Sequence, residues 1–338
     1  MFISIIVPLY NSKEFLVRCL ESIHRQTFTD YEVIVVDDGS TDGSGELAES
    51  YCADKENFHV FHKENGGVIT AWKYGFEQAK GEYIGAVDSD DFIDSDMYAV
   101  LVEKAKQHDA DIVMCNHRYV SEDLGQETPN RNPISGGFYE GETLEAIKAK
   151  ALPACGKDYI SPSRCTKIIR KELLGDCFSK YADERVSSGD DVMIIVPCTL
   201  ACKSLYYVDQ AFYSYVYRPV SISHTFKDGL FSSYSVLIDH LSKCLSDLGL
   251  DQKLQKERED LYNFYGVLWS VYVFNSTLPT AQKKVKLKEA VEASAFQVPA
   301  ACLTRASGMT AWLYKQMMKL HSPSVFLTGK KLLKILKK

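Results

Sequence analysis

The chain has 338 residues, of which 46% are hydrophobic and 25% charged, and its formal net charge is −6. This composition is typical of a globular protein, and the length allows one large core or a main domain with a smaller appendage. The negative net charge excludes a general nucleic-acid-binding role for the chain as a whole.

The spacing of the cysteines and the hydropathy of the sequence indicate the cellular compartment of the protein. The ten cysteines are scattered without a CxxC pair or zinc-like spacing, which favours a reducing compartment over a disulfide scaffold. Residues 1–9 form too short an apolar run for a signal peptide, and no run has the length of a transmembrane helix. We therefore expect a cytoplasmic protein, either soluble or peripheral on the inner face of the plasma membrane.

Short apolar runs alternate with helical patterns in the first third of the sequence. This alternation, with short links, predicts an α/β fold in which helices cover both faces of a mostly parallel sheet. We predict helices ending near residues 23 and 52 and helices at 68–79 and 97–107, with strands at 2–7, 31–36, 58–61, 83–86 and 112–115.

The pattern changes after residue 120. The Asn, Pro and Gly residues within 121–137 indicate a loop between two halves. A helical run at 192–201 and strands at 205–208 and 212–217 follow, and from residue 229 onward the pattern is helical.

Three carboxylates, those of Asp88, Asp90 and Asp91, follow the predicted strand at 83–86. They would repel one another unless a cation lies between them. Mg²⁺ and Mn²⁺ take oxygen ligands of this kind, often together with a substrate's phosphates. The alternative is a solvated turn that caps the next helix, since Asp is common at caps and turns.

Polar residues also follow the first two predicted strands, at 8–11 and 37–40. The carboxyl ends of parallel strands lie at one edge of a sheet, where open α/β folds bind their ligands. Three polar clusters that converge on this edge predict a nucleotide site.

Four segments, at 4–11, 30–44, 79–84 and 88–91, resemble in order and spacing the family 2 glycosyltransferases of the GT-A fold. The resemblance covers roughly residues 1–225. It implies a Rossmann-like GT-A domain with a mixed, mostly parallel sheet flanked by helices, followed by a helical C-terminal extension. It also implies transfer of a sugar from a nucleotide diphosphate donor with inversion, using a divalent metal.

The resemblance, together with the helical pattern from residue 229 onward, divides the chain into three regions. Residues 1–120 would be the nucleotide-sugar-binding half of the GT-A domain, and residues 121–228 the acceptor-binding half. Residues 229–338 would be a helical region that ends in a basic amphipathic tail.

The resemblance also assigns residues to the donor base. Pro8 and Tyr10 would line the base pocket, with Tyr10 stacking on the base, and Asp38 would accept a hydrogen bond from the base edge. Turn and helix-cap duties fit Asp37 or Asp42 better than Asp38.

Three residues after the strand at 83–86 would contact the rest of the donor. Asp88 would contact the ribose, and Ser89 belongs to the same donor-binding group. Asp90 would ligate the Mn²⁺ or Mg²⁺ that bridges the diphosphate.

Two further segments would meet the donor phosphates. Backbone N–H groups at Asn65 and Gly66 would bind an anion at a helix start, although a plain turn and cap fits these residues equally well. Arg218, Ser221 and Ser223 match a loop that closes over the donor phosphates in relatives, and Arg suits phosphate contact.

Asp191 is our candidate for the catalytic base, because inversion needs a carboxylate that accepts the proton of the acceptor hydroxyl. In the family a Glu-Asp pair that opens a helix serves here, and this chain has Asp190 and Asp191. The alternative is that both acids only cap a helix N-terminus.

Lys167 and Arg170 resemble a segment on the acceptor side.

The C-terminus is basic. Residues 293–338 contain eight Lys or Arg and no Asp or Glu, which leaves about −14 on residues 1–292. Leu and Ile alternate with Lys near the end, as in a basic amphipathic helix that binds anionic lipid headgroups. We expect residues 312–338 to contact an anionic membrane surface; a packed helix with a solvated lysine face is the alternative.

Taken together, these features predict an inverting hexosyltransferase. It would move a sugar from a nucleotide sugar, most simply UDP-linked, to a saccharide or lipid-linked saccharide acceptor in surface polysaccharide biosynthesis. A sugar-phosphate nucleotidyltransferase shares the architecture, but no glycine-rich loop follows the first strand. A non-catalytic nucleotide- or sugar-binding scaffold is the other alternative, although Asp90 and Asp191 are both present.

Overall fold

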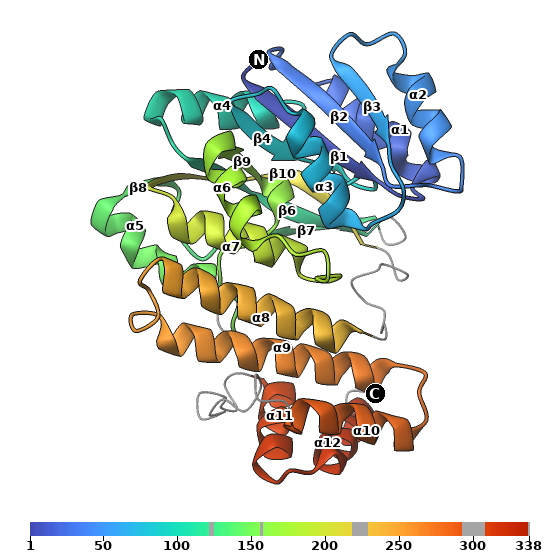
Figure 1. The fold of residues 1–338 in the computed structure, drawn as a ribbon, viewed down its shortest axis with the longest axis vertical. Coiled ribbons are helices and arrows are strands. Elements are labelled where there is room, and N and C mark those ends of the chain that lie inside the picture. The colour runs from blue at the N-terminus through green and yellow to red at the C-terminus, as the bar shows by residue number, and fades with distance from the viewer. Residues whose placement is uncertain (122–124, 156–157, 218–228, 293–307, 337–338) are drawn as a thin grey trace. The chain divides into compact units, whose positions relative to one another are not determined.

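The computed structural model describes residues 1–121, 125–155, 158–217, 229–292 and 308–336. The chain divides into two compact units. One contains Met1–Lys148 and Ser161–Arg218, and the other contains Ala149–Ile160 and Pro219–Lys338. The first unit holds a large sheet with its helices, and the second is built from helices (Figure 1).

The amino-terminal part of the sheet is parallel. β1 (Ile3–Leu9) pairs in parallel with β2 (Tyr31–Asp37) on one side and with β4 (Tyr83–Ala86) on the other. β3 (Phe58–His62) continues the parallel arrangement beyond β2. The carboxyl ends of β1, β2 and β4 therefore lie at one edge, as the alternation of strands and helices predicted.

The rest of the sheet is mixed. β6 (Ile112–Ser121) and β10 (Ser204–Val216) are parallel to each other, and β9 (Lys167–Arg170) runs antiparallel between β4 and β6. The short strands that pair only with β10 or β6, all antiparallel, are β5 (Phe92–Ile93), β7 (Gln126–Asn130) and β8 (Gly137–Glu140). A ten-stranded, mixed sheet thus joins the two expected halves of the GT-A domain.

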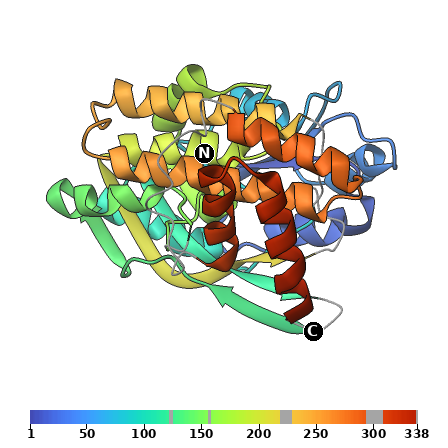
Figure 2. The ribbon, with the colours of Figure 1, turned by 90° about the horizontal axis from the view of Figure 1, so that it is seen from below.

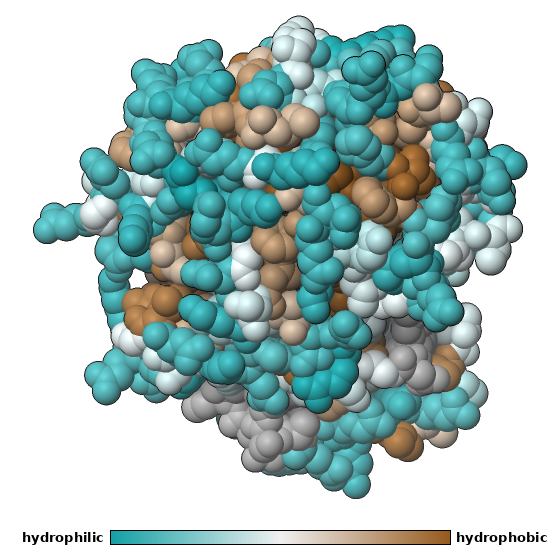
Figure 3. Space-filling view, turned by 45° about the horizontal axis from the view of Figure 1, so that its top comes forward, coloured by the Kyte–Doolittle hydropathy of each residue, from teal (hydrophilic) through white to brown (hydrophobic). Residues whose placement is uncertain are grey.

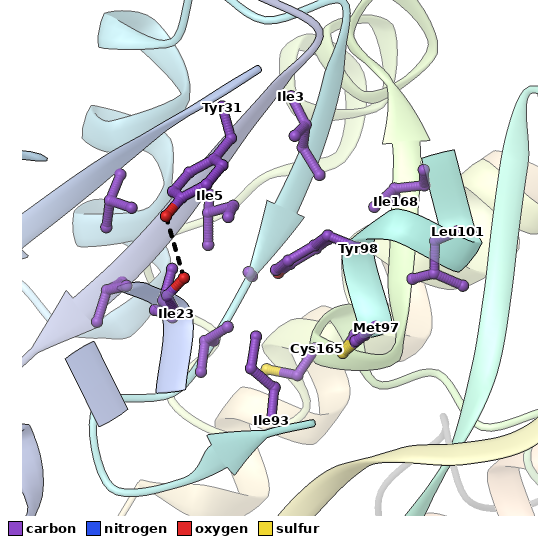
Figure 4. Packing of buried hydrophobic residues seen from close by; sticks show 14 of the residues in the cluster. Ile3, Ile5, Ile23, Tyr31, Ile93, Met97, Tyr98, Leu101, Cys165 and Ile168 are labelled. Carbon is purple, nitrogen blue, oxygen red and sulfur yellow. Dashed lines mark hydrogen bonds between the residues drawn. The ribbon is translucent and has the colours of Figure 1, made fainter. Parts of the chain in front are cut away.

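The core lies against the central strands. Every residue of β1 and of β2 is buried, which explains their near-continuous runs of Ile and Val. Figure 4 shows Ile3 and Ile5 of β1 in the same buried cluster as Tyr98. In the same cluster the Tyr31 hydroxyl donates to the Ile23 carbonyl (3.1 Å), so the one polar atom of that ring is satisfied.

Helices cover both faces of the sheet (Figure 1). α1 (Lys13–His24) and α4 (Met97–His108) contribute to the cluster that contains Ile5. The next residue, Ile6, faces the other way and meets α3 (Val68–Gln78), where an added Cβ on Gly75 would lie 2.5 Å from Ile6 Cγ2. The other helices of this unit are α2 (Ser44–Cys52), α5 (Gly141–Lys148), α6 (Lys171–Tyr181) and α7 (Asp190–Ala201).

The five strands and four helices predicted up to residue 115 are confirmed. Two predictions in the second half were wrong. The expected loop at 121–137 contains β7, where Pro129 is tolerated because, among the described strands, β7 pairs with β6 alone and so lies at an edge. The expected strands at 205–208 and 212–217 are one strand, β10, which continues through an irregular register against β6 between Tyr207 and Tyr213.

From residue 229 onward the described secondary-structure elements are all helices, as predicted. α11 and α12 lie side by side (Figures 1 and 2). α8 and α9 are also neighbours, and the ring centroids of Tyr234 on α8 and Tyr265 on α9 lie 4.7 Å apart. The helices are α8 (Leu230–Asp247), α9 (Gln255–Asn275), α10 (Thr280–Glu292), α11 (Met309–Lys319) and α12 (Pro323–Leu336).

Surface hydropathy agrees with the composition. Hydrophilic residues cover most of the face that Figure 3 shows, and hydrophobic residues gather in small patches between them. Among the described helices, none combines the length and the apolar character that crossing a bilayer requires.

Candidate active site

The loops that follow β1, β2 and β4 meet at the carboxyl edge of the sheet. The N–H of Asp38, after β2, donates to the carbonyl of Leu9 at the end of β1 (2.8 Å). The hydroxyl of Ser89, after β4, donates to the hydroxyl of Ser12 (3.0 Å). The predicted convergence of polar residues at this edge is therefore confirmed.

Tyr10 presents an aromatic ring at this edge. Pro8 is buried within β1, whereas 47% of Tyr10 is exposed just beyond the end of the strand. Asn11 shapes the turn, since it has a positive φ of 50° and its side-chain oxygen accepts a hydrogen bond from the Thr41 N–H (2.8 Å). An exposed ring in a fixed turn is suited to stacking on a planar group.

Asp38 is almost completely buried, with an exposure of 3%. Its carboxylate accepts hydrogen bonds from Lys63 Nζ (2.5 Å), the Gly66 N–H (3.0 Å) and the Gly67 N–H (2.8 Å). The Asn65 side chain donates to the Asp38 carbonyl (2.9 Å). In this structure the Gly66 N–H, which we expected to bind an anion, therefore donates to Asp38 and helps to fasten its own loop to β2.

The neighbouring acids have local duties. Asp37 Oδ1 accepts a hydrogen bond from the Ser40 N–H (3.0 Å), and Asp42 accepts one from the Ser44 N–H (2.9 Å) at the start of α2. The prediction of turn and cap duties for Asp37 and Asp42 is confirmed.

The three carboxylates after β4 have different environments. Asp91 is buried and accepts hydrogen bonds from the Tyr213 hydroxyl (2.6 Å) and the Val216 N–H (2.8 Å), which attaches this loop to β10. Burial, followed by the charges of Asp90 and Asp88, raises the pKa of Asp91 well above its usual range. Asp90 is partly buried, and 33% of the Asp88 side chain is exposed. Asp91 is therefore structural, whereas Asp88 and Asp90 are only partly buried.

The side chain of Arg164 joins the two halves of the site. It lies in a turn just before β9 and is 6% exposed. Its Nη2 donates to Asp88 Oδ1 (2.6 Å), and its Nη1 donates to Asp190 Oδ2 (2.6 Å) and Asp191 Oδ1 (2.8 Å). The guanidinium also lies 5.4 Å from the ring centroid of Trp72. Arg164 is not among the residues predicted from the sequence, although it is only three residues before Lys167.

Asp191 is in the first turn of α7, with 30% of its side chain exposed. Burial raises the pKa of Asp191 to about 7, with Asp190 and Asp88 acting in the same direction and Arg164 opposing them. A carboxylate that titrates near neutral pH is well matched to general-base catalysis.

The segment expected on the acceptor side has a structural function. Lys167 is buried, donates to the carbonyls of Ser161 (2.6 Å) and Ser163 (2.9 Å), and has its pKa lowered by burial to about 8. Arg170 pairs with Asp109 (2.6 Å) at the opposite end of the sheet, since it lies across from the first residue of β4. Arg170 therefore lies away from the candidate site, whereas Lys167 is close enough for the charge of Asp191 to raise its pKa against the effect of burial.

Within the described ranges, no three His, Cys, Asp or Glu side chains are grouped so that they could hold a metal ion. Asp90, whose charge acts on Asp91, is a carboxylate of the type that a hard cation takes together with substrate phosphates. The predicted phosphate-binding residues Arg218, Ser221 and Ser223 lie outside the described residues.

Comparison with known proteins places the chain in a family. Residues 4–178, more than half of the chain, match the profile described as Glycosyl transferase family 2. An uncharacterized glycosyltransferase of Bacillus subtilis, EpsJ, is 40% identical over 146 residues, which are 43% of this chain and 42% of EpsJ. The match thus spans about two fifths of that relative's length. A cholesterol galactosyltransferase of Borreliella burgdorferi is 29% identical over 77% of this chain and 69% of that protein.

Solved structures show the same fold. The crystal structure of S. aureus TarS 1-349 superposes with a TM-score of 0.64 at 21% identity, covering 99% of this chain and 91% of that one. A complex of TarS 1-349 with UDP-GlcNAc gives a TM-score of 0.61 at 20% identity, covering 95% and 93%. With the mixed sheet, the carboxylate loop after β4 and the family match, the chain belongs to the family 2 glycosyltransferases.

Proposed function

We propose that the chain is an inverting glycosyltransferase that moves a sugar from a UDP-sugar to a saccharide or lipid-linked saccharide in surface polysaccharide biosynthesis. The observation that carries this proposal is the bridge that Arg164 makes between Asp88 and Asp191. It holds a donor-side carboxylate and a carboxylate with a near-neutral pKa within reach of one guanidinium. Such an arrangement would keep a general base close to the bound donor, where a direct displacement by the acceptor needs it.

The donor base would lie at the end of β1 and β2. Tyr10 supplies the exposed ring for stacking beside Pro8. A carboxylate has about four acceptor positions, and Asp38 uses three of them, two on Oδ1 and one on Oδ2. The remaining position on Oδ2 would accept the N–H of a uracil ring. The TarS complexes with UDP and UDP-GlcNAc support UDP as the nucleotide.

The ribose and diphosphate would lie along the loop after β4. Asp88 would accept a hydrogen bond from the ribose while it stays paired with Arg164, and Ser89 would keep the loop in place through Ser12. Asp90 would hold Mn²⁺ or Mg²⁺ together with the diphosphate oxygens. When bound, the cation neutralises charge that develops on the departing diphosphate.

Asp191 would accept the proton of the acceptor hydroxyl. At the same time the hydroxyl oxygen of the acceptor would attack the anomeric carbon of the sugar, and the diphosphate would leave. Arg164 occupies Asp191 Oδ1, so Oδ2 is the atom that would take the proton. The hydrogen bond fixes the orientation of the carboxylate, and the positive charge keeps the pKa of Asp191 from rising further.

The Borreliella relative is named for transfer to cholesterol, which favours an acceptor with an apolar part for this chain as well. Such an acceptor would be met at a membrane, and we propose a cytoplasmic enzyme that is peripheral on the inner face of the plasma membrane.

Mn²⁺ is expected to tighten the binding of UDP by at least about tenfold, because it neutralises repulsion between the diphosphate and the loop carboxylates. Calorimetric titration with and without Mn²⁺ measures this. Asp90→Ala should abolish the metal effect. Asp96→Ala is the control, because it removes an exposed carboxylate that makes no cap hydrogen bond to α4. Equal UDP affinity with and without Mn²⁺ would rule out the metal role.

The pH dependence of kcat/KM should report Asp191. Below a pH of about 7 its carboxylate is protonated and accepts no proton, so kcat/KM should fall about tenfold per pH unit. Asp190→Asn removes a negative neighbour that raises the pKa of Asp191, so the acid limb should move to lower pH. Asp191→Asn should reduce kcat by about 10²–10⁴. A pH profile that Asp190→Asn leaves unchanged would contradict this assignment.

Arg164→Met should be strongly destabilising, by about 3–5 kcal/mol in urea unfolding, because three carboxylates lose their buried cation. Any folded protein should show the acid limb of kcat/KM at higher pH, since Arg164 lowers the pKa of Asp191. Arg164→Lys keeps the positive charge but lacks the paired N–H donors of the guanidinium, and it should shift the acid limb of kcat/KM by less. A stable Arg164→Met variant with a normal pH profile would show that the bridge has no function.

A further inference from the structure

The second unit contains a pocket of about 540 Å³, which is within the size range of sites for small ligands. Its walls come from α9, the beginning of α11, α12 and the short segment at Ala154 and Cys155. Of the described residues that line it, none is Asp or Glu, and most are apolar. The pocket is formed within one unit.

Helix α9 has two apolar faces. Tyr265 and Trp269 on one face are buried in the helical core. Phe264, Leu268 and Val271, at positions i, i+4 and i+7, form the other face, remain partly exposed and line the pocket. Apolar surface of this extent favours an apolar occupant over water.

Lysines stand at the same pocket. Lys330 and Lys334, one turn apart on α12, are part of its lining. Lys330 Nζ donates to the hydroxyl of Thr310, another lining residue (3.1 Å), and lies 5.7 Å from the ring centroid of Phe274. Lys330 is therefore directed across the pocket. It does not belong to a fully solvated lysine face, which was the alternative for this helix.

Two more lysines adjoin this group. Lys283 Nζ donates to the carbonyls of Phe274 and Ser276 (both 2.7 Å), so its charge is held beside the pocket. Burial, and then the charges of Lys331 and Lys334, lower the pKa of Lys283. Positive charge therefore accumulates here, and an anion bound among these lysines would be stabilised.

Large apolar residues are exposed next to the lysines. Met309, which lines the pocket, is 42% exposed, and Leu332, which follows Lys331 on α12, is 55% exposed. Exposed apolar side chains among lysines are typical of surfaces that enter the headgroup region of an anionic bilayer. This favours a ligand that is presented by a bilayer over one that is free in solution.

We propose that this pocket binds one anionic phospholipid of a bilayer, with an acyl chain between α9, α11 and α12 and the phosphate against Lys330 and Lys334. The basic tail would then do more than attract headgroups to its surface, because it would also contribute to a site for a single lipid molecule. It does not depend on glycosyl transfer, because its test measures binding only.

The test is flotation of the full chain with vesicles of phosphatidylcholine, with and without phosphatidylglycerol. The wild type should float only with phosphatidylglycerol. Lys330→Gln combined with Lys334→Gln should reduce the bound fraction by at least about tenfold. Val271→Trp, which fills the pocket and keeps every lysine, should have a similar effect. Lys73→Gln combined with Lys256→Gln removes two exposed lysines elsewhere and should bind as the wild type does.

Titration with a short-chain phosphatidylglycerol, below its micelle concentration, gives a second readout that needs no bilayer. It should saturate at one molecule per chain and be lost in Val271→Trp, with circular dichroism showing that the variant is folded. Normal flotation of folded Val271→Trp would overturn the proposal, because only surface charge would then be involved. Equal loss of binding in the two lysine pairs would overturn it as well.

Discussion

The buried guanidinium of Arg164 is the interaction on which the candidate active site depends. It contacts Asp88, Asp190 and Asp191 at 2.6–2.8 Å and thereby joins the loop after β4 to the start of α7. Neither the cation nor the carboxylates would be stable in this environment alone, so each group fixes the others. The charged groups are therefore in place before a substrate arrives, and little reorganisation remains for the reaction itself.

The first half of the fold could be predicted because β1 and β2 are buried on both faces, which makes their sequences unbroken apolar runs. β7 could not, because a polar edge strand containing Pro129 resembles a loop. Asp191 was named as the candidate base from the resemblance to a Glu-Asp pair that opens a helix, and the structure has it in the first turn of α7. Arg164 was missed because its partners are 76, 26 and 27 residues away, and no local pattern marks a buried cation. The Gly66 N–H was assigned to an anion for a similar reason, since its actual acceptor, Asp38, is 28 residues away.

The two units have different physical characters. In the first, buried charge is matched by opposite charge, and the site is built from groups that hold one another in place. In the second, lysines gather around an apolar pocket where none of the described lining residues is acidic. The first arrangement suits a reaction at a polar centre, and the second suits attachment to an anionic, apolar phase. A membrane-associated transferase would use both.

The most direct test of inversion requires no acceptor. Proton NMR can follow the slow hydrolysis of UDP-sugars by the enzyme with Mg²⁺ and identify which anomer of the sugar appears first, before mutarotation. UDP-sugars with an α linkage should give the β anomer first, because water attacks opposite the diphosphate with Asp191 as the base. Initial release of the α anomer, or equal hydrolysis by Asp191→Asn, would contradict the proposed mechanism.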